Sequence, residues 1–334
     1  MYTDEDLNQA IQKGIFTASA VDEFRHTVSD SKYTISADEE NFNMIGGFND
    51  IFVVIACCLL LFSSLFVLIP ITGFFGLIIF VATSWWLAEI FVLKRKMALP
   101  AILLLFAFVG GVFSFVISMS SDLSHPSLFS IILATSASMI AAFFHWKRFK
   151  VPITIAAGTV ALIALIVSIF ISIFPNEEKW ILTILSICGI ATFFLAMYWD
   201  ASDTKRITNK SDVAFWCHLI AAPLFIHPAF TSLGVMDGNE NMLNMLGVVI
   251  LYLIMTTLSI AIDRRAFMVS SLAYVLYALT TILKNYGDVG YSFALTGLFM
   301  GAMLLLLSVF WQTTRSFIVK KLPIKIRKLL PAVN

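Results

Sequence analysis

Ten long, almost uncharged apolar runs constrain this chain more than any other feature of its sequence. A bilayer core about 30 Å thick requires roughly 20 apolar residues in helical form to cross it. Backbone within lipid must satisfy its own hydrogen bonds, and these runs lack the alternation of membrane-barrel strands. The sequence therefore predicts an all-α, polytopic membrane helix bundle of about ten transmembrane helices. The predicted spans are residues 51–69, 72–93, 97–119, 127–146, 151–174, 180–199, 213–234, 242–262, 266–283 and 290–311.

The composition agrees with membrane insertion. Apolar residues make up 59% of the chain and charged residues 13%, whereas soluble domains carry about 25% charged residues. The four cysteines lie within apolar runs and form no CxxC pair, so neither a disulfide framework nor a metal site is expected. No cofactor is expected. A net charge of only +1, without a basic aromatic groove, argues against nucleic-acid binding.

The distribution of Lys and Arg predicts the orientation in the membrane. Basic loop residues mark the cytoplasmic side of a membrane protein. Beyond residue 50, all but two of the Lys and Arg residues fall on one side of the predicted bundle; Lys179 and Lys284 are the exceptions. Both termini are therefore expected in the cytoplasm. The basic clusters that define this side are residues 94–96, 147–150, 205–210, 264–265 and 315–328.

The charge pattern divides the chain into three predicted parts. Residues 1–49 are expected to form an acidic cytoplasmic helical hairpin and linker, with Gly14 ending the first helix and a capped start near Ser19 for the second. Such a hairpin is too small to hold its own core, so it is expected to dock on the bundle or on a protein partner. Residues 50–312 form the ten-helix transmembrane domain. Residues 313–334 form a basic cytoplasmic tail, which suits an amphipathic stretch on anionic lipid, although its charges also satisfy the orientation rule.

Two segments carry a resemblance to other proteins. The module DLNQAIQKGIFT at residues 6–17, followed by a capped second helix and many spans, resembles uncharacterised bacterial polytopic membrane families that begin with a short helical hairpin. The stretch FWCHLIAAPLFIHP at residues 215–228 is similar to one found in such proteins. These families have no established activity. The resemblance therefore implies a multi-pass protein of the bacterial cell inner membrane and no specific reaction.

The seventh span is unusual because it contains Pro223 and Pro228 together with His218 and His227. Proline removes a helical hydrogen bond and disfavours helix in the residue before it. A broken helix at membrane depth is tolerated against protein or a water-lined cavity, so the segment beginning at Trp216 is the best candidate binding site. The alternative is a kinked packing helix with hydrogen-bonded histidines. The two histidines fall on opposite helix faces, which disfavours a bis-histidine haem or metal site.

Glu89 is the only formally charged residue within the ten runs, and such residues are often functional. Counted from the span borders, Glu89 and His218 lie at similar depth in the cytoplasmic third. Ten spans also divide into two halves of five in opposite orientations, as in inverted-repeat transporters, and the second and seventh spans then correspond. One hypothesis is a Glu89–His218 pair that binds a proton or a polar solute. The alternative is that Glu89 reaches a loop base such as Lys94 or Arg95.

Two weaker features concern the last two spans. Tyr274 and Tyr277 in the ninth span either line a cavity or pack together. The sequence GLFMG at residues 297–301 is a GxxxG motif that permits close helix approach. It predicts packing within the bundle or, alternatively, a homodimer face.

Two functions remain open from the sequence. The first is a permease or transporter-like protein for a small solute or lipid, with a cavity at the second and seventh helices. The second is a non-catalytic scaffold, sensor or regulatory protein that docks through its N-terminal hairpin. An intramembrane enzyme is disfavoured because no protease or redox motif is present, and no catalytic residue is predicted.

Overall fold

The computed structural model describes residues 11, 13–17, 19–24, 48–119, 126–204, 206, 208–234, 241–286, 291–327 and 329–331. The chain divides into two units, Met1–Phe42 and Asn43–Asn334. In the first unit, residues 19–24 are helical and the Thr17 hydroxyl accepts a hydrogen bond from the Ala20 amide at 3.2 Å. Gly14 has a φ of +69°, the left-handed conformation expected of a residue that ends a helix. The rest of the predicted hairpin lies outside the described residues.

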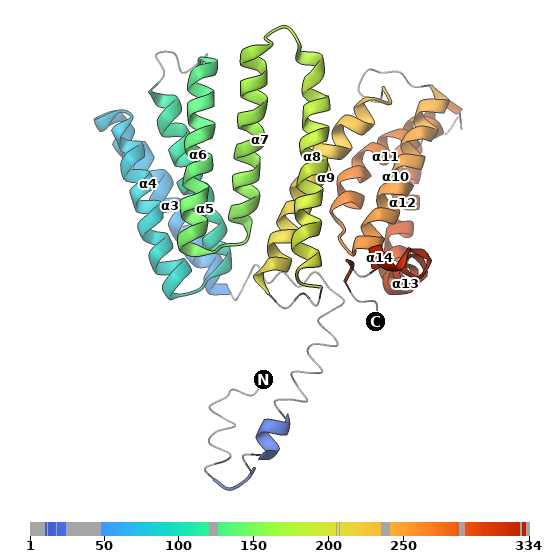
Figure 1. Ribbon diagram of the computed structural model, residues 1–334, viewed down its shortest axis with the longest axis horizontal. Helices are drawn as coiled ribbons and strands as arrows, with labels where there is room; N and C mark the ends of the chain where they lie inside the picture. The colour runs from blue at the N-terminus through green and yellow to red at the C-terminus, as the bar shows by residue number, and fades with distance from the viewer. Residues whose placement is uncertain are drawn as a thin grey trace. The chain divides into compact units, whose positions relative to one another are not determined.

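The second unit is built from helices, and its described residues contain no strand. Among them, ten helices are long and apolar enough to cross a membrane, which confirms the predicted all-α polytopic bundle. In chain order they are α3 (Phe48–Thr72), α4 (Phe75–Ala88) continued by the π-helix η1 (Glu89–Lys94), α5 (Ala98–Ser118), α6 (Leu128–Phe149), α7 (Ile153–Ile173), α8 (Ile181–Ala201), α9 (Asn209–Thr231), α10 (Met242–Ile262), α11 (Ala266–Tyr286) and α12 (Ser292–Val309) (Figure 1).

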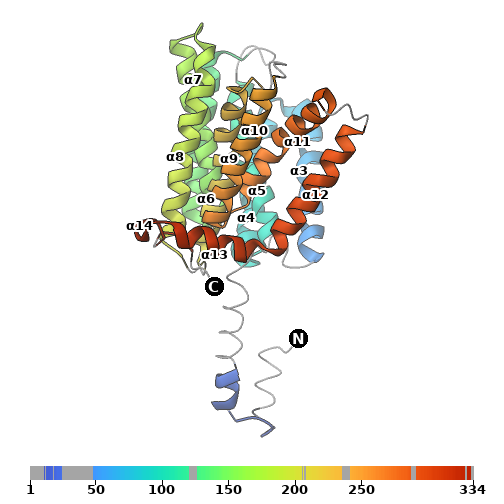
Figure 2. The ribbon, with the colours of Figure 1, turned by 90° about the vertical axis from the view of Figure 1, so that its right-hand side faces the viewer.

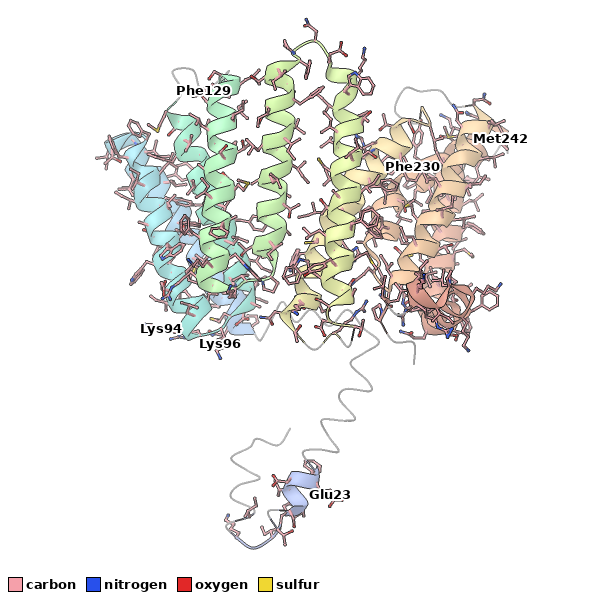
Figure 3. All side chains as sticks on the ribbon, in the orientation of Figure 1. Glu23, Lys94, Lys96, Phe129, Phe230 and Met242 are labelled. Carbon is pink, nitrogen blue, oxygen red and sulfur yellow. The ribbon has the colours of Figure 1, made fainter. Side chains whose placement is uncertain are left out.

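Successive spans run in opposite directions across the bundle (Figure 1). Lys94 and Lys96 lie at one end of the bundle and Phe129 and Met242 at the other (Figure 3). We call the end with Lys94 and Lys96 the basic face. Large apolar side chains point outward along the spans; Phe66, for example, is 82% exposed. Only a hydrocarbon environment accommodates so much exposed apolar surface without aggregation.

Local capping explains several of the helix boundaries. The side chains of Ser127, Thr208 and Asn241 accept hydrogen bonds from the first turns of α6, α9 and α10, which satisfies amide groups that have no partner within the helix. At the other end of their helices, Lys150 and Asp263 adopt left-handed conformations with φ of 55° and 57°. These residues reverse the chain after α6 and α10.

The helices pack as two successive groups of five. The first five spans contact one another in sequence, and α7 then contacts α8 and α9 of the second group. The two groups do not pack alike: α4 and α5 share an extensive interface, whereas the equivalent pair α9 and α10 shares almost none among the described residues. The arrangement therefore gives no support to a pair of inverted repeats.

The seventh span, α9, is a continuous helix through both of its prolines, so the predicted break is wrong. It packs most extensively against α8. The two helices come close together at Gly189, where an added Cβ would lie 2.8 Å from the Phe225 amide nitrogen and 2.9 Å from the Leu224 carbonyl carbon. The segment between the two prolines therefore packs directly against the backbone of α8.

The GxxxG motif of α12 makes no close helix contact with the part of the chain that the structure describes. An added Cβ at Gly297 or Gly301 would meet no described atom within 4 Å. The interpretation as a packing site inside the bundle is therefore wrong, while the homodimer face stays a prediction.

Beyond the last span, α13 (Trp311–Lys321) crosses the basic face nearly perpendicular to the spans (Figure 2) and is followed by the short α14 (Ile324–Arg327). Trp311, Arg315 and Val319 recur every four residues and are the buried residues of α13, as expected for one face of a helix. Val319 and Leu330 belong to a core cluster with residues of α9, α10 and α11. This part of the predicted tail is therefore packed on the bundle.

Candidate functional site

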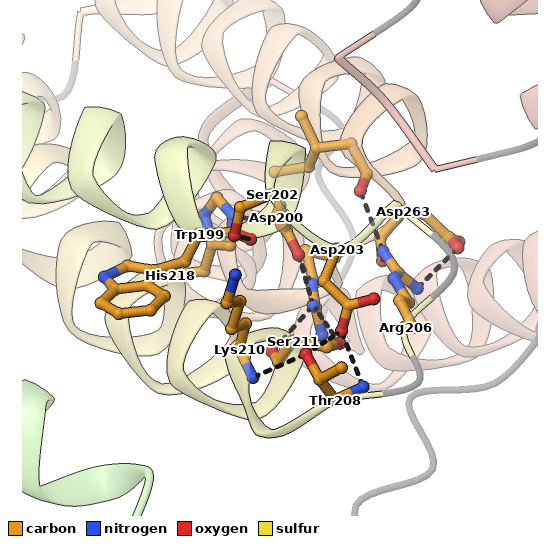
Figure 4. Close-up of polar contacts among 12 residues, drawn as sticks. Trp199, Asp200, Ser202, Asp203, Arg206, Thr208, Lys210, Ser211, His218 and Asp263 are labelled. Atoms are coloured by element: carbon orange, nitrogen blue, oxygen red, sulfur yellow. Dashed lines mark hydrogen bonds and ion pairs between the residues drawn. The ribbon is translucent and has the colours of Figure 1, made fainter.

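The basic face encloses a network of buried charged side chains that begins with Asp200 and His218. Asp200 lies in the last turn of α8 and is 1% exposed, and His218 on α9 is fully buried. The His218 Nε2 and Asp200 Oδ2 atoms are 2.9 Å apart (Figure 4). A polar side chain is costly to bury without a hydrogen-bond partner, so each group supports the burial of the other.

Arg264 connects this pair to a third structural element. It follows Asp263, the left-handed residue at the end of α10. Its Nη2 donates to Asp200 Oδ1 at 2.6 Å and to the carbonyl and hydroxyl oxygens of Ser211, both at 3.1 Å. Both oxygens of Asp200 are thus engaged, and the carboxylate holds the ends of α8 and α9 to the α10–α11 connection. We call Asp200, Ser211, His218 and Arg264 the inner cluster.

A second cluster lies beside the first and holds the C-terminal segment. Asp263 accepts hydrogen bonds from Arg206 Nη1 at 2.9 Å and from Trp311 Nε1 at 2.8 Å. The Arg315 Nε lies 3.8 Å from Asp263 Oδ1, and its Nη2 donates to the Pro331 carbonyl at 2.7 Å. We call Arg206, Asp263, Trp311 and Arg315 the outer cluster. It joins α13 and the segment at Pro331 to the end of α10.

The arginine side chains of this network keep their positive charge although they are buried. Burial, and secondarily the positive charge of Arg264, lower the pKa of Arg206 from its ordinary value. A guanidinium nevertheless stays protonated in proteins. Removing charges from water costs several kcal/mol per ion, and a good pair with additional hydrogen bonds is needed to offset that cost. The Asp200 and Asp263 carboxylates supply these interactions.

The structure separates the two residues of the predicted Glu89–His218 pair. The Glu89 carboxylate binds Arg148 of α6 through two hydrogen bonds of 2.8 Å each, whereas His218 binds Asp200. The predicted pair is therefore wrong, and the alternative, a carboxylate that reaches a basic residue at the membrane boundary, describes Glu89 correctly. The Arg148 side chain is 54% exposed and the Glu89 side chain 29%, so the pair is a partly exposed contact between the start of η1 and the end of α6.

A groove with apolar walls runs along α9 on the side that faces the first five spans. Two adjoining cavities of about 480 and 760 Å³ share Val160 and Ala164 of α7 and Leu219 and Ile220 of α9. The smaller also touches α5, and both touch α6. We call the combined space the lateral groove. Val160 is 47% exposed and Leu219 41%, so the groove is open along one side.

The polar groups of the groove wall are few. The hydroxyls of Thr135, Ser138 and Ser168 donate to carbonyls of their own helices. His227 lines the larger cavity, and its Nδ1 lies 2.6 Å from the hydroxyl of Tyr274. The lining residues include no Asp, Glu, Lys or Arg. The groove is therefore suited to an apolar molecule, because a charged one would find no counter-charge there.

Only some of the predicted site residues belong to the lateral groove or the inner cluster. Trp216, Pro223 and His227 line the lateral groove, and His218 belongs to the inner cluster. Tyr274 binds His227 and stacks on Phe230 with ring centroids 4.5 Å apart, on α11 and outside the groove lining. Tyr277 and Glu89 line neither cavity. Among the described residues, the seventh span lines both cavities of the lateral groove, and no residue of the second span lines either of them.

Sequence reasoning missed Asp200, Arg206, Asp263, Arg264 and Arg315 as members of a buried site. The positive-inside rule treats such residues as loop charges at span ends, and Asp200 falls one residue past the predicted sixth span. One available signal was the direct succession of Asp263 and Arg264 between two spans. An acidic and a basic residue next to each other in such a short connection between spans are consistent with buried ion pairs.

Comparison with protein-family models, with curated proteins and with solved structures gives no match for this chain. The fold itself defines the class: an integral, multi-pass membrane protein with ten candidate spans among its described residues. Within that class no family is identified.

Proposed function

We propose that the protein binds an apolar, chain-shaped molecule of the bilayer, such as a lipid, in the lateral groove. The observation that carries this proposal is the length of uncharged wall. The lining extends from Ile153 to Ile171 on α7, which corresponds to roughly 27 Å at 1.5 Å per residue. That length is close to the thickness of the hydrocarbon core, about 30 Å.

The openness of the groove supports entry from the membrane. Val160 and Leu219 are exposed on its walls, and exposed positions within a span face lipid. A lipid chain can enter sideways without losing contact with apolar surroundings. An ion or polar solute would have to shed water without compensating hydrogen bonds, which costs several kcal/mol.

A permease-like role for a lipid follows as the more specific part of the proposal. The groove lies where α7 of the first five spans meets α9 of the second five, and transporters commonly bind substrate between two such bundles near the bilayer midplane. The resemblance of residues 6–17 and 215–228 supports a bacterial inner-membrane location, and the positive-inside rule supports a cytoplasmic basic face. A scaffold or sensor that docks through residues 1–49 is the alternative, and it rests on the sequence alone.

Photo-crosslinking tests the binding proposal. The chain is reconstituted in nanodiscs that contain phosphatidylcholine with a diazirine in one acyl chain, and the crosslinked residues are mapped by mass spectrometry. We expect labelling of the groove walls on α7 and α9 to exceed that of equally exposed positions on α3 and α12. Equal labelling of all exposed apolar positions would contradict a binding groove.

A matched pair of variants sharpens this experiment. Ala164 is an exposed residue in the groove wall, whereas Ala191 is an exposed residue of α8 outside the groove lining. Ala164→Phe fills the groove and is expected to reduce labelling at Leu219 and Ile220 severalfold. Ala191→Phe adds the same bulk elsewhere and is expected to leave that labelling unchanged.

A further inference from the structure

The C-terminal helices α13 and α14 present a second, independent surface. The packed face of α13 contains Trp311, Arg315 and Val319. The remaining surface carries both exposed apolar side chains and exposed bases. Phe317 is 61% exposed and Ile324 71%. The exposed bases of this surface are Lys320, Lys321, Lys325 and Arg327.

The positive charges of this surface are not balanced by acidic residues of the same segment. Residues 311–334 contain no Asp or Glu. Among the ion pairs of the described residues, Arg315 is the only member from α13 or α14. The Lys321 ammonium lies 4.0 Å from the centre of the Phe317 ring, so cationic and apolar groups share one face. The surface therefore combines the two properties that attract anionic lipid.

The outer cluster fixes which face of α13 is presented. Trp311 donates to Asp263, and Arg315 approaches the same carboxylate while it binds the Pro331 carbonyl. Trp311 and Arg315 lie on successive turns of one helix face. Their contacts therefore determine the rotation of α13 about its axis. α13 also lies across the ends of the spans rather than along them (Figure 2). An interfacial helix has this orientation.

We propose that α13 and α14 form a binding surface for the headgroups of anionic phospholipids in the bilayer that surrounds the bundle. Phe317 and Ile324 enter the boundary between headgroups and acyl chains, while Lys320, Lys321 and Lys325 bind phosphates. An acidic soluble partner would match the charges but would not require the exposed apolar side chains. Lipid satisfies both.

Hydrogen–deuterium exchange of the full chain tests this proposal. The chain is placed in nanodiscs of phosphatidylcholine alone or of phosphatidylcholine mixed with phosphatidylglycerol. We expect amides of residues 313–327 to exchange severalfold more slowly with phosphatidylglycerol, and this protection to weaken in high salt. Identical exchange in the two lipid mixtures would overturn the proposal.

Two variants and a control locate the effect. K320Q/K321Q/K325Q/R327Q is expected to lose the dependence on phosphatidylglycerol. The control K94Q/R95Q/K96Q/K147Q removes four exposed bases elsewhere on the basic face and is expected to keep the dependence at residues 313–327. Exchange in α3 to α12 reports whether each variant retains its fold and orientation. If the four-glutamine tail variant is misfolded, F317S/I324S serves as the test instead. Full wild-type protection of residues 313–327 in F317S/I324S would also overturn the proposal.

Discussion

The imidazole of His218 and the carboxylate of Asp200 meet at 2.9 Å between two adjacent helices, and both are almost completely buried. Arg264 approaches the same carboxylate from the α10–α11 connection. The pair therefore belongs to a three-way junction, in which one aspartate neutralises a guanidinium and holds a histidine. This junction gives the ends of α8, α9 and α10 a fixed relationship at the basic face.

Asp200→Asn is expected to destabilise the bundle strongly, because it leaves the Arg264 guanidinium buried without its counter-charge. Breaking one side of a buried ion pair typically costs about 3–5 kcal/mol. The double change Asp200→Leu with Arg264→Met removes both charges and is expected to cost less. Thermal unfolding in detergent, followed by fluorescence, measures the difference. If the single variant proves as stable as the wild type, the inner cluster does not contribute to folding.

Glu89→Gln, unlike Asp200→Asn, is expected to change the stability of the bundle very little. Its partner Arg148 lies at the end of α6 and is 54% exposed, and ion pairs at exposed positions contribute little compared with buried ones. We expect Glu89→Gln and Arg148→Gln to unfold at nearly the wild-type temperature under the same conditions. A loss comparable to that of Asp200→Asn would show that Glu89 has a role that the surface contact does not explain.

Gly189→Ala is expected to destabilise the α8–α9 interface. Its new methyl group would lie 2.8 Å from the Phe225 amide nitrogen, so one helix must move, and such overpacking costs roughly 1–3 kcal/mol. Gly297→Ala is the matched control, since its methyl group meets no described atom within 4 Å. The unfolding temperatures of the two variants test the comparison. Equal temperatures would mean that α8 can shift away from α9 without penalty.

The spans were predictable from the sequence because membrane insertion depends on local composition. The predicted run 151–174 corresponds to α7 (Ile153–Ile173), and 242–262 to α10 (Met242–Ile262). Hydropathy over some 20 residues suffices for this, since each helix satisfies its own backbone. The continuity of α9 was harder to predict, because the sequence does not show tertiary contacts such as the one between Gly189 and the segment at Leu224 and Phe225.

The candidate site was predictable only in part, because its members meet through tertiary packing. Trp216, Pro223 and His227 attracted attention through their unusual span, and they do line the groove. Burial of Asp263 and Arg315 involves α13, which packs against the end of α10, and hydropathy does not predict where such a helix docks. Counting Arg264 and Arg315 as loop charges predicted that they lie at the same end of the bundle but did not predict their partners.

Asp263→Asn is expected to loosen α13 while it leaves the spans intact. Asparagine tolerates the left-handed conformation that Asp263 adopts, and its amide oxygen can still accept the hydrogen bond from Trp311. It offers no negative charge to Arg206 or Arg315, however. Hydrogen bonds to charged groups contribute about 1.5–3 kcal/mol, so amides in α13 are expected to exchange roughly ten- to hundredfold faster.

The control for this experiment is Asp203→Asn. Asp203 accepts hydrogen bonds from the amide and hydroxyl of Thr208 at the start of α9. Its substitution is expected to affect exchange near Thr208 and to leave residues 311–321 as protected as in the wild type. If Asp263→Asn also leaves those residues protected, α13 is held by the apolar contacts of Val319 and Leu330 rather than by the outer cluster.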